Sequence, residues 1–227
     1  MFQIEQISIL FVTIALAGAF WLISKQFKDF QKDKKPNRLV AAIILFVQWL
    51  NGYTISAMGS YYGPKFSAYI GSIFIFILVS NLSGLVGLQP PTANFSVTLA
   101  LTLITWIGIQ VVSIKTNGIK GYLAGFAEPF AFFIIPNIFG QLAPLVSLSV
   151  RLFGNVIAGA TIMSMLYSFT AWASSFIPII GNFNFIGVGI GSILHLYFDV
   201  FSGFLQTFIF ISLTIIFIGV EAPQEDH

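Results

Sequence analysis

Long apolar stretches separated by short polar ones form the dominant pattern of this chain. Residues 7–23, 66–88 and 95–114 are each apolar over roughly the 20 residues that a helix needs to cross a bilayer. Two longer apolar stretches follow, at residues 129–170 and 185–220. The pattern predicts an all-α integral membrane protein with about five transmembrane helices.

The last two stretches are too long to stand upright in a bilayer. A helix of about 40 residues spans roughly 60 Å, which is about twice the hydrocarbon thickness. Both helices must therefore tilt steeply or bend, and Pro136, Pro144, Gly154 and Gly159 are places where the first of them can bend.

Proline marks two further boundaries. Pro90 and Pro91 cannot continue a helix, so residues 66–114 are predicted to form a helical hairpin around them. After a loop at residues 115–128, Pro129 is well placed to open the next helix.

Residues 39–60 are more polar than the other apolar stretches, because Gln48, Asn51, Thr54 and Ser56 lie among them. If this stretch does not cross the membrane, the basic residues before and after it lie on one face, as the positive-inside rule favours. We therefore expect an interfacial or re-entrant helix here, with a transmembrane helix as the alternative.

Charge predicts the orientation of the chain. The run at residues 25–38, KQFKDFQKDKKPNR, has six Lys or Arg against two Asp and is expected to be a cytoplasmic loop. The N-terminus then lies outside, and the acidic tail at residues 221–227 is expected to be cytoplasmic. The first span follows no basic segment and precedes no small-residue cleavage pattern, so we expect it to remain uncleaved.

Composition agrees with a membrane protein and excludes several kinds of chemistry. Hydrophobic residues make up 57% of the chain and charged residues 8%, which is too little polar surface for a soluble globule. The absence of Cys excludes disulfides, thiolate metal sites and cysteine nucleophiles. We expect residues 1–227 to form a single membrane domain without a cofactor or a metal.

Three ionisable residues stand inside the apolar stretches: Arg151, His195 and Asp199. An Arg or Asp near the bilayer centre costs about 2.5 to 3.5 kcal/mol on insertion, so such a residue indicates a functional site by default. We expect Arg151 to belong to an ion-translocation path. The alternatives are a structurally paired arginine, a carboxyl of Asp199 that only bonds a neighbouring helix, and an interfacial His195.

Helical spacing groups these residues with other polar ones. Ser147, Arg151 and Asn155 recur every four residues and share a face. The side chains of a second group form a polar stripe on the last helix, which indicates a wet or inter-helix face. That group is His195, Asp199, Ser202 and Gln206.

Several segments resemble one family of membrane proteins. Residues 144–159, PLVSLSVRLFGNVIAG, and residues 205–218, LQTFIFISLTIIFI, are similar to subunit a, the ion-channel stator subunit of rotary F-type ATP synthases. The similarity extends through residues 80–85, 90–101 and 118–129. It implies one N-terminal span, a membrane-surface helix, a hairpin, and two long tilted helices that embrace a rotating ring of c subunits.

The resemblance also implies roles for individual residues. Arg151 matches the family's essential arginine, and Asn155 matches the asparagine one turn later. Gln206 matches the glutamine that faces the arginine, and Asn81 matches a polar residue of the outer half-channel. Carboxylates on the c subunits would be neutral in lipid, and Arg151 would stabilise their ionised form, so that each ion leaves to one half-channel and is replaced from the other.

The chain departs from the family pattern at both half-channels. Ala160 stands where many members have an acid, so the outer half-channel acid would be Asp199, helped by His195. Gly140 and Gln141 stand where glutamates often occur, which makes the inner half-channel less acidic. The implied ion is a proton, with sodium as the alternative.

The resemblance implies a non-enzymatic subunit that couples ion flow to ATP synthesis in a bacterial plasma membrane. Its partners would be the c-subunit ring, the b-subunit peripheral stalk and the lipid bilayer, with no nucleic acid and no nucleotide bound by this chain. A secondary ion transporter is one alternative, although no inverted repeat supports it. A structural subunit of a respiratory complex is another. Enzyme motifs such as HExxH, GxSxG and the P-loop are absent.

Overall fold

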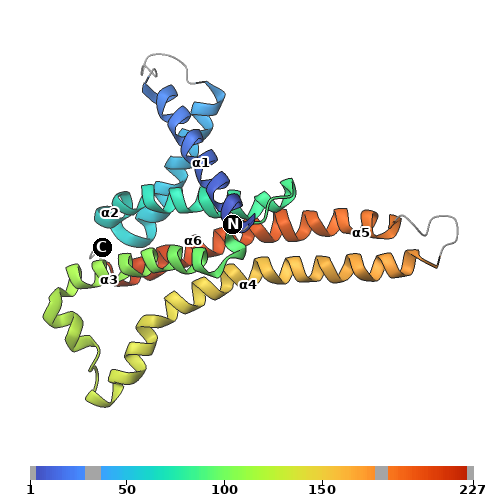
Figure 1. Cartoon of the computed structure of the whole chain (residues 1–227). Helices are drawn as coiled ribbons and strands as arrows, with labels where there is room; N and C mark the ends of the chain where they lie inside the picture. The colour runs from blue at the N-terminus through green and yellow to red at the C-terminus, as the bar shows by residue number, and fades with distance from the viewer. Residues whose placement is uncertain (1–3, 29–36, 177–183, 224–227) are drawn as a thin grey trace.

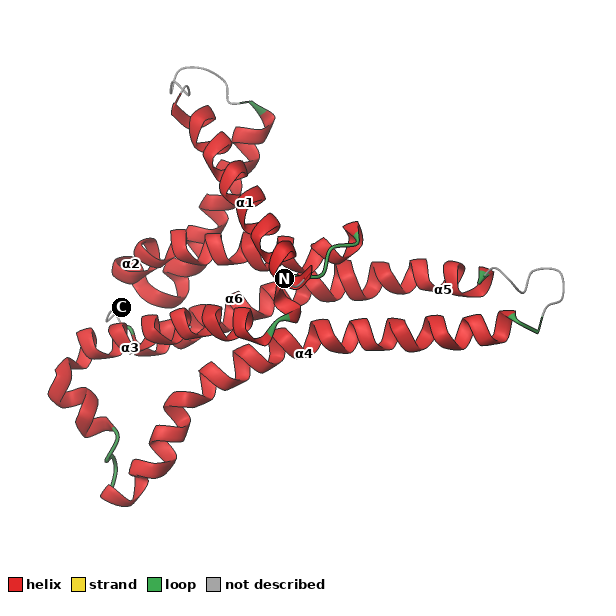
Figure 2. Cartoon of the chain, viewed as in Figure 1, coloured by secondary structure: helices red, strands yellow, loops and turns green. Residues whose placement is uncertain are grey.

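The computed structural model describes residues 4–28, 37–176 and 184–223, and throughout these ranges the regular structure is helical (Figure 2). Five helical segments of this part are long and apolar enough to cross a membrane. They are Gln6–Lys25, Arg38–Val86, Phe95–Gly125, Ala131–Ser174 and Phe185–Glu221. The predicted all-α class with five candidate spans is confirmed.

Helix α1, Ile4–Lys28, is followed by the long helix α2, Arg38–Leu82, which changes direction at Gly59. Gly59 has φ 76° and ψ 172°, a backbone conformation that is readily adopted only without a Cβ. The part of α2 before the break lies beside α1, and the part after it runs along α6 (Figure 1). The segment expected at residues 39–60 thus ends at a real break, while its place on the membrane surface stays a prediction.

Two short 3₁₀ turns, Ser83–Val86 and Pro91–Ala93, lead from α2 into α3, Phe95–Gly125. Asn94 caps α3 by accepting a hydrogen bond from the backbone N–H of Ser96. Helix α3 also breaks, at Gly118, where φ is 70°. The expected loop at residues 115–128 is therefore wrong in part, because the chain resumes a helix after this glycine and stays helical to Gly125.

Helix α4, Ile134–Ser174, begins later than Pro129, because Phe130 is extended and a 3₁₀ turn, Ala131–Phe133, intervenes. The helix is bent (Figure 1), and it contains Pro144, which has no N–H to donate to the preceding turn. The final segment consists of α5, Phe185–His195, a π-helical turn, Leu196–Ser202, and α6, Gly203–Glu221. Helices α4 and α5 lie side by side as a two-helix arm (Figure 1).

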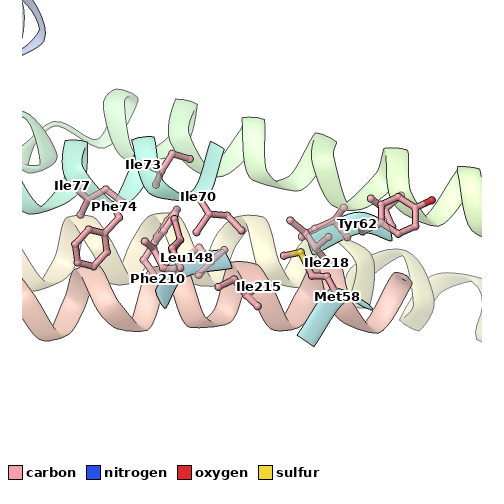
Figure 3. Close-up of a cluster of buried hydrophobic side chains, with 14 of the residues drawn as sticks. Met58, Tyr62, Ile70, Ile73, Phe74, Ile77, Leu148, Phe210, Ile215 and Ile218 are labelled. Atoms are coloured by element: carbon pink, nitrogen blue, oxygen red, sulfur yellow. The ribbon is translucent and has the colours of Figure 1, made fainter. Parts of the chain in front are cut away.

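Helix α6 is the central element of the packing. It contacts α2, α3 and α4, and its fully buried Phe210, Ile215 and Ile218 belong to one hydrophobic cluster with Leu148 of α4 and Ile70 and Met58 of α2 (Figure 3). Helix α4 is far more open, since 6% of its most apolar 18-residue stretch is buried, against 44% for the segment containing α6. One long face of α4 therefore has no partner within the described chain.

Candidate functional site: two polar cavities and an arginine

A cavity of about 510 Å³, with a few polar side chains among mostly apolar ones, lies where the π-helical turn meets α6. Four of the predicted site residues line it: Asn81, Asn155, His195 and Asp199. We name it the Asp199 cavity. The other lining residues come from the α2–α3 connection, the middle of α4 and the final segment, and they are Gly84, Gly87, Leu88, Gln89, Pro90, Ala93, Val156, Ile157, Gly159, Ala160, Met163, Phe198 and Gly203.

His195 and Asp199 form the titratable pair of this cavity. The imidazole Nδ1 of His195 lies 2.6 Å from Oδ2 of Asp199, and the two side chains are 40% and 24% exposed. Asp199 sits within the π-helical turn, a feature found disproportionately at functional sites in helices. The pair is only partly buried and lines the cavity, so its position suits ion access better than a sealed structural role.

Asn155 joins α4 to the final segment at the same cavity. Its Oδ1 accepts a hydrogen bond from the hydroxyl of Ser202 at 3.0 Å. Gly159, one turn further along α4, lies against Phe198, at a distance that would leave a Cβ in ordinary contact with its side chain. Two of the four residues in the predicted polar stripe, His195 and Asp199, line the cavity, and Ser202 bonds across to α4.

Asn81 is buried at the inner wall of the cavity, with 6% exposure. Its Nδ2 donates to the carbonyl oxygen of Gly203 at 3.1 Å and to Oγ1 of Thr207 at 3.3 Å. Its Oδ1 accepts from Thr92 at 2.8 Å. Sequence reasoning missed Thr92 and Thr207, and the signal that could have found Thr92 is its place in the PPTANF segment.

Arg151 and Gln206 lie outside this cavity and do not meet each other. Arg151 is exposed on α4, and within the described chain its guanidinium donates to Ser147 at 3.5 Å. Gln206 is buried, with 6% exposure, and its Nε2 finds no acceptor among the described residues. No hydrogen bond joins the two side chains here, although the resemblance implies that they face each other.

A second polar cavity, of about 330 Å³, lies between the end of α3, the start of α4 and the end of α6. We name it the Glu221 cavity, because Glu221 at the end of α6 lines it. The other lining residues are Ser113, Asn117, Gly121, Tyr122, Gly125, Phe126, Asn137, Gly140 and Gln141. Sequence reasoning placed Glu221 in a solvated tail and did not find this cavity.

Helix α6 connects the two cavities. Gly203 at its start lines the first cavity, and Glu221 at its end lines the second. Its 19 residues span about 28 Å, close to the hydrocarbon thickness of a bilayer. Along α4, Arg151 falls between Gln141, which lines the second cavity, and Asn155, which lines the first.

The two cavities differ in the ionisable groups that line them: His195 and Asp199 in the first, Glu221 in the second. The described residues contain no group of three or more His, Cys, Asp or Glu side chains that could hold a metal ion. They do provide two partly open cavities that carry polar side chains, a His–Asp pair, and an exposed guanidinium on a mostly apolar helix. This combination defines a class of protein: a multi-span helical membrane protein that translocates ions.

Comparison with known proteins identifies the family within that class. Residues 7–219 match the family described as ATP synthase A chain. The chain belongs to this family, whose members are subunit a, the ion-translocating stator subunit of the F-type ATP synthase complex. It is therefore a multi-pass membrane protein and a channel subunit without a catalytic site of its own.

The relatives are bacterial. The chain is 32% identical to ATP synthase subunit a of Desulforamulus reducens over 95% of this chain and 79% of that protein. It is 32% identical to the subunit a of Mycoplasma genitalium over 92% of this chain and 76% of that one. It is 30% identical to a protein of Propionigenium modestum named ATP synthase subunit a, sodium ion specific, over 95% of this chain and 72% of the relative.

Proposed function

We propose that this chain couples proton flow to ATP synthesis by loading and unloading carboxylates on a rotating c-subunit ring. One observation carries the proposal: Arg151 lies on the open face of α4, between two polar cavities at opposite ends of α6. Two separate cavities act as half-channels, so an ion can pass from one to the other only when it is bound to a c-subunit carboxylate that moves between them.

The open apolar face of α4 is the proposed docking surface for the ring. Val146 and Val150 are 58% and 52% exposed there and flank Arg151. A c-subunit carboxylate in lipid stays neutral because a bare carboxylate in hydrocarbon is very costly. Beside the guanidinium of Arg151 the ionised form is favoured, so the carboxyl releases its ion into one cavity and accepts another from the other cavity.

Arg151 also prevents a leak. A guanidinium does not deprotonate in proteins, so it cannot pass protons from one cavity to the other. Ion flow through the chain then requires rotation of the ring. Held by the b-subunit peripheral stalk, the chain would act as the stator against which the ring turns.

The proposed orientation places the Glu221 cavity on the cytoplasmic side of a bacterial plasma membrane. Lys115 and Lys120 belong to the same end of the molecule as this cavity, since they lie in the last part of α3. The positive-inside rule favours this end as cytoplasmic. The Asp199 cavity then opens to the outside.

ATP-driven acidification of inverted vesicles that contain the assembled complex tests the proposal. Arg151→Ala should abolish acidification while the complex still assembles, and the control Lys65→Ala, which removes an exposed cation elsewhere, should leave it unchanged. Coupled pumping by Arg151→Ala would contradict the proposal.

Sodium is the second candidate ion, because the Propionigenium modestum relative is named sodium ion specific. The same vesicles distinguish the two ions. Acidification that an uncoupler collapses supports protons, whereas sodium uptake that an uncoupler stimulates keeps the mechanism and changes the ion.

A further inference from the structure

The Glu221 cavity has an unusual charge arrangement for a membrane protein. Among the described residues that line it, Glu221 is the one carboxylate, and none is Lys, Arg or His. Glu221 is half-buried and has no cationic partner within 4.0 Å among the described residues. It is also the last residue of α6, where the negative end of the helix dipole disfavours a carboxylate.

These features do not stabilise the fold. An unpaired carboxylate at a helix C-terminus costs free energy instead of contributing it, and partial burial adds to the cost. A carboxylate in a hollow between low-dielectric walls does have another effect, since it concentrates cations there. The position of Glu221 is therefore better explained by ion capture than by stability.

A chain of polar groups joins two residues of the cavity wall, Tyr122 and Gln141, through the buried amide of Gln110. The hydroxyl of Tyr122 donates to Oε1 of Gln110 at 2.6 Å, and Nε2 of Gln110 donates to Oε1 of Gln141 at 3.1 Å. Gln110 is buried, with 8% exposure. The indole N–H of Trp106 donates to the backbone carbonyl of Gln141 at 2.7 Å, which fixes this turn of α4 against α3.

We propose that Glu221 is the cation-capturing carboxylate of this cavity and that the Gln110–Gln141 amide pair forms the inner end of the same access path. The inference rests on the proposed function of the chain as an ion-translocating stator. It assigns the acidic group of this cavity to the end of the last helix. Cations entering from the water meet Glu221 first and then the amides.

ATP-driven acidification of inverted vesicles tests the assignment, because this cavity then faces the bath that supplies the ions. Glu221→Gln keeps the shape and removes the charge, so the rate should fall about tenfold, the lower limit of the effect of focused charge on cation arrival. The matched control is Glu128→Gln, which removes an exposed acid that lies outside the cavity but at the same end of the molecule.

A rescue variant separates ion capture from a structural role. Gln141→Glu in the Glu221→Gln background returns a carboxylate to another wall of the same cavity and should restore most of the rate. Equal rates for Glu221→Gln and Glu128→Gln would overturn the assignment, and so would a slow rate that Gln141→Glu does not restore. Failure of the proposed function itself would appear separately, as coupled pumping by Arg151→Ala.

Discussion

His195 and Asp199 meet across the junction between α5 and the π-helical turn, with Nδ1 of the imidazole 2.6 Å from Oδ2 of the carboxyl. Both side chains also line the Asp199 cavity. The pair therefore combines a short contact within one helical segment with a place on the cavity wall. The contact with the imidazole fixes the orientation of the carboxyl at that wall.

Asp199→Asn tests whether this carboxyl relays ions. The amide keeps the size of the side chain and can still bond His195, but it cannot ionise. Proton transfer by a positioned side chain contributes about 10² to 10⁴-fold, so we expect ATP-driven acidification to fall at least about tenfold with assembly unchanged.

The control for this variant is Ser192→Ala, which removes an exposed hydroxyl on the same helix that bonds only its own backbone, at 2.8 Å to Val188. It should pump at the wild-type rate. If Asp199→Asn pumps equally well, the carboxyl is a replaceable hydrogen-bonding group and the outer half-channel needs no acid there.

The main elements follow from the sequence because hydrophobic length and charge specify them. The apolar stretches predict five spans, and the polar residues at 39–60 predict an interfacial segment, which ends close to the observed break at Gly59. His195 and Asp199 could be paired from their spacing alone, because residues four apart share a helix face.

The contacts between helices could not be predicted in the same way. Serine and threonine in membrane helices usually bond their own backbone, as Thr170 does to Leu166 at 2.8 Å. The polar stripe places Ser202 on an inter-helix face, but nothing in the sequence identifies Asn155 as the residue that it bonds across helices. The π-helical turn likewise has no residue pattern that marks it.

Burial decides the role of Glu221, and the sequence does not contain that information. A carboxylate two residues before a proline at the end of a chain is normally solvated. It lines a cavity here because α3 extends past its break at Gly118 and brings Tyr122 to the end of α6. The apolar pattern predicts that the hairpin ends at residue 114, whereas α3 continues to Gly125.

Asn81→Leu should destabilise the junction of α2 and α6. The amide of Asn81 donates to Gly203 and Thr207 and accepts from Thr92, all in a buried setting. Its loss leaves buried polar groups without partners, which lowers the free energy of unfolding by about 1 to 3 kcal/mol. The midpoint of thermal unfolding of the complex in lipid nanodiscs should fall accordingly.

A double-mutant cycle with Thr92→Val checks that the contact is the cause. The two changes should be clearly non-additive, because each removes the same hydrogen bond of 2.8 Å. Thr13→Val is the control, since Thr13 is on α1 and bonds only its own helix. Additive effects of Asn81→Leu and Thr92→Val would mean that the two residues act independently.

The end of α6 is fixed by a close approach to the break in α2. A Cβ added at Gly219 would overlap the carbonyl oxygen of Ala57, which lies just before Gly59. The backbones of the two helices can touch here only because residue 219 has no side chain. This contact also sets the position of Glu221, two residues further along α6.

Gly219→Ala should therefore lower both stability and transport. Overpacking of this kind costs typically about 1 to 3 kcal/mol, and relief by shifting α6 would displace Glu221 from its cavity. Gly189→Ala is the matched control, because a Cβ at Gly189 meets nothing within 4 Å and alanine favours a helix by about 1 kcal/mol over glycine. In Gly219→Ala, both the midpoint of thermal unfolding in nanodiscs and the rate of acidification in vesicles should fall. In Gly189→Ala, neither should fall. An unchanged unfolding midpoint in Gly219→Ala would show that the two helices can separate without cost, and the end of α6 would then not be anchored by the break in α2.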